Sequence, residues 1–388
     1  MFDGSHSGAV PAKTPNGMLA MTKAVTLPSI VAITVPVGAY HPRLRDCLNS
    51  LRCQTPLVSV ALMDASNDPR VCGIADEFDD LLHYRHHGPD DGQADAIAAG
   101  WAQLDGDVLG WLNADDVLLP GAIELVLRTF EQSPTADLVY GHSEIVRDNG
   151  AFSGYHWGVA PPSTGALRTN CFISQPSCFF KRVTYDRIGG LDVGLHYTMD
   201  WDLWVRFQDA NAEFVFVDEV LSSVLWSKDA KTGGFGKGRR SELNTIIGGH
   251  ERWTDRLKAM IGFSSHHLLE YVVPERVARA VRRVKASKSG HQYGIDWSGG
   301  LRQRASVPLY HYDDVPATKV EISYSGCPQG VRAAVDGALL PVHEHPGTRR
   351  LVLDLNEPLL PGNRRTLLLD RSSSEPLFIE GLRLLPAG

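Results

Sequence analysis

The fold is decided by the stretch Gly106–Val126, which reads GDVLGWLNADDVLLPGAIELV. Its first part, Val108–Leu112, is a short apolar run without charge, long enough for one buried strand. The run ends at Asn113-Ala114-Asp115-Asp116, and apolar residues then recur at helical spacing, with Pro120 suited to the first turn of the helix. Carboxylates are thereby placed at the carboxyl end of a buried strand, where open α/β sheets bind their ligands.

The four residues Asn113–Asp116 allow two interpretations. A divalent cation that bridges two phosphates needs hard oxygen ligands held in a fixed place, and an aspartate here would supply one. Aspartates also cap helices, and a helix is expected to follow directly. The tetrapeptide alone does not choose between a metal site and a helix cap.

The chain on the amino-terminal side of this stretch alternates between strand-like and helix-like periods. Strands are expected at Ser29–Val35, Val58–Met63 and Leu81–Tyr84, and helices at Pro42–Cys53 and Gly92–Leu104. Strands that alternate with helices of this length predict an α/β fold with a doubly wound, mainly parallel sheet.

After Asp137 the pattern changes, and the short runs between Leu138 and Tyr155, separated by turn residues, predict antiparallel pairing. Strands are expected at Leu138–Tyr140, Ser143–Val146, Phe152–Tyr155, Ser177–Phe180 and Phe214–Val217, helices at Arg182–Gly190 and Met199–Gln208, and a mobile loop at Lys228–Arg240. We expect this α/β domain to span residues 29–245, preceded by a disordered tail at 1–28.

The remainder of the chain predicts two further parts. Residues 246–290 read as a basic helical linker, in which 274–288 form a basic amphipathic helix suited either to an anionic membrane surface or to docking on its own protein. Residues 291–388 lose the helical period. Short runs there predict a small all-β sandwich with strands at Thr318–Tyr324, Gly330–Val335, Arg350–Leu355, Arg365–Leu369 and Leu377–Leu384.

Composition narrows the function classes. A chain of 388 residues suits two domains, and its net charge of −7 argues against nucleic acid as a partner. The six cysteines show no C-x-x-C pair, which predicts reduced thiols and a cytoplasmic protein. No apolar run reaches the ~18–20 residues that span a bilayer.

Several stretches between about Ser29 and Thr232 resemble glycosyltransferase family 2, whose members have the GT-A fold and inverting chemistry. Asp64 resembles the family's base-reading aspartate, and Asn113–Asp116 its D-x-D metal motif. The other motifs that carry the resemblance are Gly92-Gln93-Ala94-Asp95-Ala96, Gln175-Pro176-Ser177, Gly189-Gly190-Leu191-Asp192 and Met199-Asp200-Trp201-Asp202-Leu203-Trp204.

The resemblance implies an enzyme that moves a sugar from a nucleotide-diphosphate sugar, a UDP-sugar by preference, to a hydroxyl of a glycan or lipid-linked acceptor. Asp200 would be the general base, with an N-cap of the Trp201–Gln208 helix as its structural alternative. Asp115 would hold Mn²⁺ or Mg²⁺, with Asp116 supporting it or capping the helix. The implied donor-binding residues are Pro36, Tyr40, Asp64, Gln93, Asp95, Asn113, Asp115 and Lys228, and the implied acceptor-side residues are Gln175, Trp201 and Asp202, the last as the fallback base.

The same resemblance implies a role in bacterial polysaccharide biosynthesis, at the inner face of the membrane if residues 274–288 bind lipid, and an accessory role in acceptor binding or oligomer formation for the C-terminal domain. Trp204 is expected in the core, whereas Trp201 is left open between core and sugar stacking. His83, His86 and His87 are expected to form a solvated patch rather than a ligand set.

This sequence also departs from the family pattern. Val35–Tyr40 lacks the usual Pro-aromatic-Asn, a polar residue common in relatives is Ala98, and Lys228 stands where relatives often carry a metal- or phosphate-binding histidine. Lys228, or Lys231 beside it, would neutralise diphosphate as a point charge, which puts the metal requirement in doubt. Two alternatives follow: a non-catalytic sugar- or nucleotide-binding relative, and a nucleotidyltransferase, which would need more than the one glycine of Val35–Tyr40.

Overall fold

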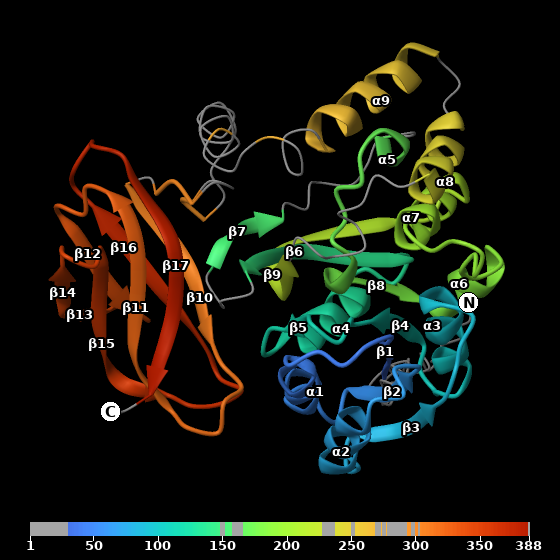
Figure 1. The fold of residues 1–388 in the computed structure, drawn as a ribbon, viewed down its shortest axis with the longest axis horizontal. Helices are drawn as coiled ribbons and strands as arrows, with labels where there is room; N and C mark the ends of the chain where they lie inside the picture. Colours follow the sequence, from blue (N-terminus) through green and yellow to red (C-terminus); the bar gives the residue numbers. More distant parts are fainter. Residues whose placement is uncertain are drawn as a thin grey trace, which may run out of the picture.

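The computed structural model describes residues 30–147, 152–156, 166–226, 237–249, 253–267, 273, 277, 293–295, 299–301 and 303–386. Its first part is built on a nine-stranded sheet of order β3-β2-β1-β4-β8-β6-β9-β5, with β7 paired to β6 (Figure 1). The strands are β1 (Val31–Val37), β2 (Val58–Asp64), β3 (Leu82–His87), β4 (Val108–Trp111), β5 (Val117–Leu118), β6 (Leu138–Arg147), β7 (Phe152–His156), β8 (Cys178–Lys181) and β9 (Phe214–Trp226).

Helices cover both faces of this sheet (Figure 1). They are α1 (Leu44–Arg52), α2 (Pro69–Glu77), α3 (Gln93–Ala102), α4 (Ala122–Gln132), α5 (Ala166–Thr169), α6 (Arg182–Arg187), α7 (Met199–Asp209), α8 (Lys237–Gly248) and α9 (Trp253–His267), with a short 3₁₀ turn at Gln175–Ser177. One core lies between the sheet and α1, α2 and α4, and a second lies between the sheet and α3, α7 and α8. The predicted α/β class is confirmed.

The period of two in β1 assigns its side chains to these two cores. Val31, Ile33 and Val35 belong to the first core, and Ala32 belongs to the second. Helix α3 lies directly on β1, because a Cβ at Gly100 would come within 2.5 Å of the Thr34 side chain. Glycine at this position is therefore a packing requirement.

The second core is organised by aromatic rings. Trp111 of β4 stacks on Trp204 of α7 with ring centroids 5.9 Å apart, and Trp101 of α3 meets Trp111 edge-on at 5.7 Å. The expected core position of Trp204 is confirmed, since its side chain is fully buried. These rings fix α7 against the strand that precedes Asn113–Asp116.

The C-terminal part contains two four-stranded antiparallel sheets, of order β10-β16-β12-β13 and β14-β15-β11-β17. The strands are β10 (Arg304–Tyr310), β11 (Ala317–Gly326), β12 (Val331–Val335), β13 (Ala338–Leu340), β14 (Val342–His345), β15 (Arg350–Leu359), β16 (Arg364–Arg371) and β17 (Leu377–Pro386). Inward-facing residues of both sheets share one core, which makes this part a β-sandwich, as predicted.

The sandwich is joined to the α/β domain through apolar and polar contacts. Leu119, Tyr155 and Val220 of the α/β domain belong to the core of the sandwich. The hydroxyl of Tyr310 donates a hydrogen bond to the buried carboxylate of Glu144, and burial raises the pKa of that carboxyl. Further bonds run from Tyr312 to the Leu118 carbonyl and from Arg364 to the Val220 carbonyl and to Glu219.

Several predicted boundaries differ from the observed ones. The two runs predicted at Leu138–Tyr140 and Ser143–Val146 form one strand, β6, because a register shift at Tyr140–His142 absorbs the interruption. Strand β9 runs on to Trp226, and α2 and the short strand β5 were not predicted. Pro120 precedes α4 rather than lying in its first turn, since Gly121 is the N-cap.

The predicted mobile loop Lys228–Arg240 ends in helix instead, because α8 begins at Lys237. The tail 1–28 lies outside the described residues, as do Lys228, Lys231 and, apart from Val277, residues 274–288. Within the described part of the chain, no helix is long and apolar enough to cross a membrane.

The aromatic core yields a test of stability. Trp204→Ala should lower the free energy of unfolding by about 3–5 kcal/mol, because it removes a fully buried ring that stacks on Trp111. Trp253→Ala is the matched control, since the side chain of Trp253 is 71% exposed and the change should stay within ~0.5 kcal/mol. Urea unfolding monitored by circular dichroism measures both, and equal losses would contradict the assignment of Trp204 to the core.

Candidate active site

The candidate site lies at the carboxyl edge of the parallel strands. Strand β1 pairs in parallel with β2 and with β4, so the three strands end at the same edge of the sheet. Asp64 is the last residue of β2, and Asn113–Asp116 follow the end of β4. The carboxylates predicted from the sequence therefore share one edge.

Asn113 is the centre of a hydrogen-bonded amide cluster at this edge. Its Oδ1 accepts a bond from Gln93 Nε2 at 2.8 Å, and its Nδ2 donates to Gln175 Oε1 at 3.5 Å and to Asp116 Oδ2 at 3.3 Å. Gln175 in turn donates through Nε2 to the Trp111 carbonyl at 2.7 Å. Gln93, which was predicted on the donor side, and Gln175, which was predicted on the acceptor side, are thus joined through one asparagine.

Asp116 supports the loop from inside the protein. Its side chain is 3% exposed, and its Oδ1 accepts a bond from the Leu225 amide of β9 at 3.0 Å. Burial, together with the neighbouring Asp115 charge, raises the pKa of Asp116 to about 8. The alternative that Asp116 caps the next helix is wrong, because the N-cap of α4 is Gly121.

Asp115 differs from its neighbour. It is partly exposed, and no described residue donates a hydrogen bond to its carboxylate. A hard divalent cation takes oxygen ligands and keeps several positions for phosphate oxygens and water. A single available carboxylate, set in a loop held by Asn113 and Asp116, fits a cation of that kind.

Asp64 is buried and fully engaged, with a side-chain exposure of 1%. Its Oδ1 accepts bonds from the Ser66 amide at 2.9 Å and the Ser66 hydroxyl at 2.5 Å, and its Oδ2 lies 2.9 Å from His87 Nδ1. His87 is exposed, as expected for a solvated histidine, and it is in addition a partner of the predicted base-reading residue. The same Nδ1 lies 3.4 Å from the sulfur of Cys72.

Three further residues that were predicted to bind the donor have different surroundings. Pro36 is a buried residue inside β1, which gives its ring no surface for a nucleotide. Tyr40 follows β1, and the Arg70 guanidinium covers one face of its ring at 3.8 Å. Asp95 lies in the first turn of α3, where its carboxylate accepts a bond from the Asp91 amide at 3.4 Å.

Asp200 lies in the first turn of α7 and is partly buried. Its Oδ1 accepts a bond from the Trp201 amide at 2.8 Å, and burial raises the pKa of its carboxyl. The N-cap of α7 is Thr198, so the alternative that Asp200 is the N-cap is wrong. Burial raises the pKa of the Cys178 thiol, and the neighbouring Cys171 and Asp200 raise it further.

The two neighbours of Asp200 on α7 have structural contacts. Trp201, which the sequence left open between core and sugar stacking, is buried, and its indole N–H donates to the Leu167 carbonyl, which favours the core position. Asp202 accepts a bond from Arg206 Nε at 2.7 Å, and Arg206 also donates to the Gly190 carbonyl at 2.6 Å. Asp202 thus fixes the glycine turn after α6, which disfavours it as a fallback base.

Glu242 of α8 is a residue that the sequence reasoning missed. Its carboxylate accepts bonds from the amides of His196, Tyr197 and Thr198 at 2.9–3.0 Å, and so holds the segment that leads into Asp200. His196 lies against Gly92, whose positive φ of 124° opens the turn before Gln93. The Gly/Lys-rich sequence before Glu242 carried no helical signal.

Arg43 is a second missed residue. Its positive charge lowers the pKa of Asp116, Glu144 and Asp46, against the larger opposite effect of burial. Arg43 is the N-cap of α1, where a positive charge is unfavourable to the helix dipole.

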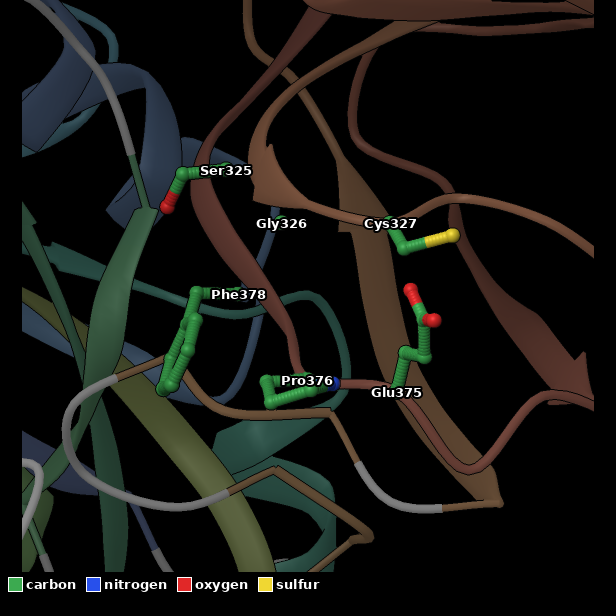
Figure 2. A pocket seen from close by; sticks show the side chains of 6 residues that line it. All are labelled: Ser325, Gly326, Cys327, Glu375, Pro376 and Phe378. Carbon is green, nitrogen blue, oxygen red and sulfur yellow. The ribbon is translucent and has the colours of Figure 1, made fainter.

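The hollow shown in Figure 2 is separate from these residues. It has a volume of ≈ 600 Å³ and is lined by Ser325, Gly326, Cys327, Glu375, Pro376 and Phe378 of the sandwich. None of the predicted site residues lines it.

The α/β domain thus gathers carboxylates and amides at the carboxyl edge of its parallel strands, where open α/β sheets bind their ligands. Residues 32–189 match the family model described as glycosyl transferase family 2. This domain belongs to glycosyltransferase family 2, and the chain is a glycosyltransferase. The match favours a glycosyltransferase over the nucleotidyltransferase alternative.

Related sequences agree with this class. An uncharacterised glycosyltransferase of Rickettsia typhi is 25% identical over 264 residues, which cover 63% of this chain and 79% of the relative. The O-antigen biosynthesis protein RfbC of Myxococcus xanthus is 26% identical over 216 residues, or 54% of this chain and 17% of that protein.

Solved structures show a looser likeness. Residues 1–349 of TarS from S. aureus, in complex with UDP-GlcNAc, align with a TM-score of 0.46 at 12% identity over 66% of this chain and 80% of that one. The mannosyltransferase PcManGT from Pyrobaculum calidifontis, in complex with GDP-Man and Mn²⁺, aligns with a TM-score of 0.43 at 15% identity over 68% of this chain and 77% of that one.

Asp116 gives a prediction about pH. Its folded pKa of about 8 exceeds the ordinary 3.8, so the stability it contributes is present below pH ~3.8 and lost as pH rises through about 8. With chelator present, the free energy of unfolding should therefore fall as the pH rises from 5 to 8, and it should fall more steeply in the unmodified protein than in Asp116→Asn. The two slopes should differ by up to ~1.4 kcal/mol per pH unit. Urea unfolding across this range measures both slopes, and parallel curves would contradict a buried, proton-binding Asp116.

Proposed function

We propose that this enzyme transfers a sugar, with inversion, from a nucleoside-diphosphate sugar to an acceptor hydroxyl. The observation that carries the proposal is the amide bridge from Gln93 through Asn113 to Gln175. This bridge joins the donor-side helix α3, the loop with Asp115 and the acceptor-side turn at one edge of the sheet. Any direct sugar transfer needs such an arrangement, because donor and attacking hydroxyl must meet within one site.

Asp115 is the proposed metal ligand. It would hold Mn²⁺ or Mg²⁺, which when bound supplies Lewis-acid stabilisation of the negative charge on the leaving diphosphate. Asn113 and Asp116 hold the loop so that Asp115 needs little reorganisation on binding. Lys228 is proposed as an additional point charge for the diphosphate.

Asp200 is the proposed general base, which removes the proton from the acceptor hydroxyl during attack. Burial raises the pKa of its carboxyl, which brings the group closer to the pKa that suits a base at neutral pH. Glu242 acts as a positioning residue, because it fixes the backbone of the three residues that precede α7's first turn.

A uridine diphosphate sugar is the proposed donor. Asp64 lies at the end of β2, and an Asp64 oxygen would accept the N3–H of uracil in place of, or shared with, His87. TarS binds UDP-GlcNAc and PcManGT binds GDP-Man, so nucleotide sugars of both kinds occur among the aligned structures.

A glycan or lipid-linked acceptor of bacterial polysaccharide biosynthesis completes the proposal, supported by the O-antigen biosynthesis relative. Peripheral contact with the inner face of a membrane is part of it. Helix α9 exposes Trp253, Leu257, Met260 and Ile261, which recur at helical spacing, and the basic residues 274–288 follow in the sequence.

Asp200 provides the decisive test. Asp200→Asn keeps the shape of the side chain but removes the base, so kcat should fall by about 10²–10⁴-fold while donor affinity stays unchanged. Asp202→Asn on the same helix is the matched control. Because Asp202 contacts Arg206, this change should lower the melting temperature and leave kcat close to that of the unmodified enzyme. Transfer rates, calorimetry and thermal melting on both variants separate the two roles. Near-normal transfer by a folded Asp200→Asn protein would exclude Asp200 as the base.

Asp115 provides a test of metal dependence. Asp115→Asn should lower turnover by about 10²–10³-fold and weaken donor binding, because several kcal/mol of charge stabilisation depend on the ion. Asp105→Asn is the control, because Asp105 is exposed and lies before the first residue of β4, at the end of the strand opposite to Asp115. This change should alter neither turnover nor donor binding. Calorimetry with uridine diphosphate and added Mn²⁺ gives the affinity. Full activity of the unmodified enzyme in excess chelator would contradict the metal role, and Lys228→Ala should then be the damaging change.

A further inference from the structure

A second group of potential ligands lies beside the donor-side edge. Asp64, Cys72 and His87 offer one oxygen, one sulfur and one nitrogen atom, all within 4.8 Å of one another. His87 Nδ1 lies 2.9 Å from Asp64 Oδ2 and 3.4 Å from Cys72 Sγ. The proposed transfer reaction assigns no role to Cys72 or His87.

The fold brings these residues together from three elements. Asp64 and His87 are register partners at the ends of the parallel strands β2 and β3. Helix α2 starts after its N-cap Asp68, whose carboxylate accepts the Arg70 amide, and this start places Cys72 over the strand ends. Burial decreases from Asp64 through Cys72 to His87, which leaves an approach for an ion from solvent.

The spacing fits a tetrahedral metal ion. Bonds of ~2.0–2.1 Å to nitrogen or oxygen and ~2.3 Å to sulfur separate neighbouring ligands by roughly 3.3–3.6 Å. The observed 2.9 and 3.4 Å are shorter by a few tenths of an ångström, as expected for groups that hydrogen-bond to one another before an ion enters. Small side-chain shifts would admit the ion.

The ligand types select the ion. Mg²⁺ and Mn²⁺ prefer sets of oxygen ligands, whereas thiolate and imidazole favour Zn²⁺. Ser66 donates its amide and its hydroxyl to Asp64 Oδ1, which orients Oδ2 toward His87 and Cys72. Supporting hydrogen bonds of this kind are typical of carboxylates that ligate zinc.

We propose that Asp64, Cys72 and His87 bind a Zn²⁺ ion, with the fourth position open to water. The Cys72 thiol releases its proton to solvent as the Zn–S bond forms, and His87 binds as neutral imidazole through Nδ1. Zinc binding itself is independent of the transfer reaction. Its consequence rests on the proposed function: an ion on Asp64 Oδ2 competes with the nucleobase of the donor, so zinc inhibits by excluding the nucleotide.

Cobalt is the probe for the site, because a thiolate ligand gives Co²⁺ a charge-transfer absorption that oxygen ligands such as Asp115 do not give. The full-length protein should show this band on titration with Co²⁺ and lose it when one equivalent of Zn²⁺ is added. Cys72→Ser should abolish the band, and His87→Gln should weaken zinc affinity by about tenfold or more.

Cys53→Ser and His86→Gln are matched controls that should leave both band and affinity unchanged, since Cys53 is an exposed thiol elsewhere and His86 is the β3 neighbour of His87. An absent band, or a band that persists in Cys72→Ser, overturns the proposal.

A competition experiment separates this proposal from the proposed function. Uridine diphosphate should displace Zn²⁺ from the unmodified protein and weaken its apparent affinity. Zinc binding that uridine diphosphate leaves unchanged would keep the metal site and remove Asp64 from base recognition. Binding of uridine diphosphate that depends on Asp64, in a protein without the cobalt band, would keep the donor role and overturn the zinc site.

Discussion

The interaction on which the site depends is the buried carboxylate of Asp116 between the loop after β4 and strand β9. A carboxylate inside a protein is costly unless hydrogen bonds satisfy it, so the loop has one favourable position. Because Asn113 is held at the same time, Gln93 and Gln175 both have a fixed partner. A single buried acid thereby sets the geometry for residues from α3, the loop and the acceptor-side turn.

Charge balance around that acid is incomplete within the protein. Asp115, Asp116, Asp46 and Glu144 are grouped near Arg43, and burial acts against the charged form of three of these carboxyls. Burial and the neighbouring Asp115 charge together keep Asp116 protonated below about pH 8.

The sequence predicted the parts of the site that depend on local pattern. The buried run Val108–Leu112 and the apolar spacing in α3 and α7 were sufficient to place Asn113, Gln93 and Asp200 at element ends. Contacts that depend on register or on distant segments were not predictable. His87 meets Asp64 only because of the way β2 and β3 pair.

The same reason explains the other differences. Glu242 acts through backbone amides 44–46 positions away, and its helix begins in a glycine- and lysine-rich stretch without amphipathic signal. Trp201 and Asp202 have motif positions that suit a substrate role, yet packing against Leu167 and Arg206 decides their contacts. The position of a residue in a motif thus predicts the region of the fold in which it lies, whereas its contact partners depend on tertiary packing.

The docking of the sandwich means that the region that matches the family model is shorter than the region that packs as one folded body. The family match ends at residue 189, before α7 and β9. The core of the C-terminal sheets includes Leu119, Tyr155 and Val220, and Tyr310 satisfies the buried Glu144. Separating the two parts would expose these apolar side chains and leave an acid without its partner. The C-terminal sheets and the α/β domain therefore share one interior, and neither part keeps all of its buried groups satisfied without the other.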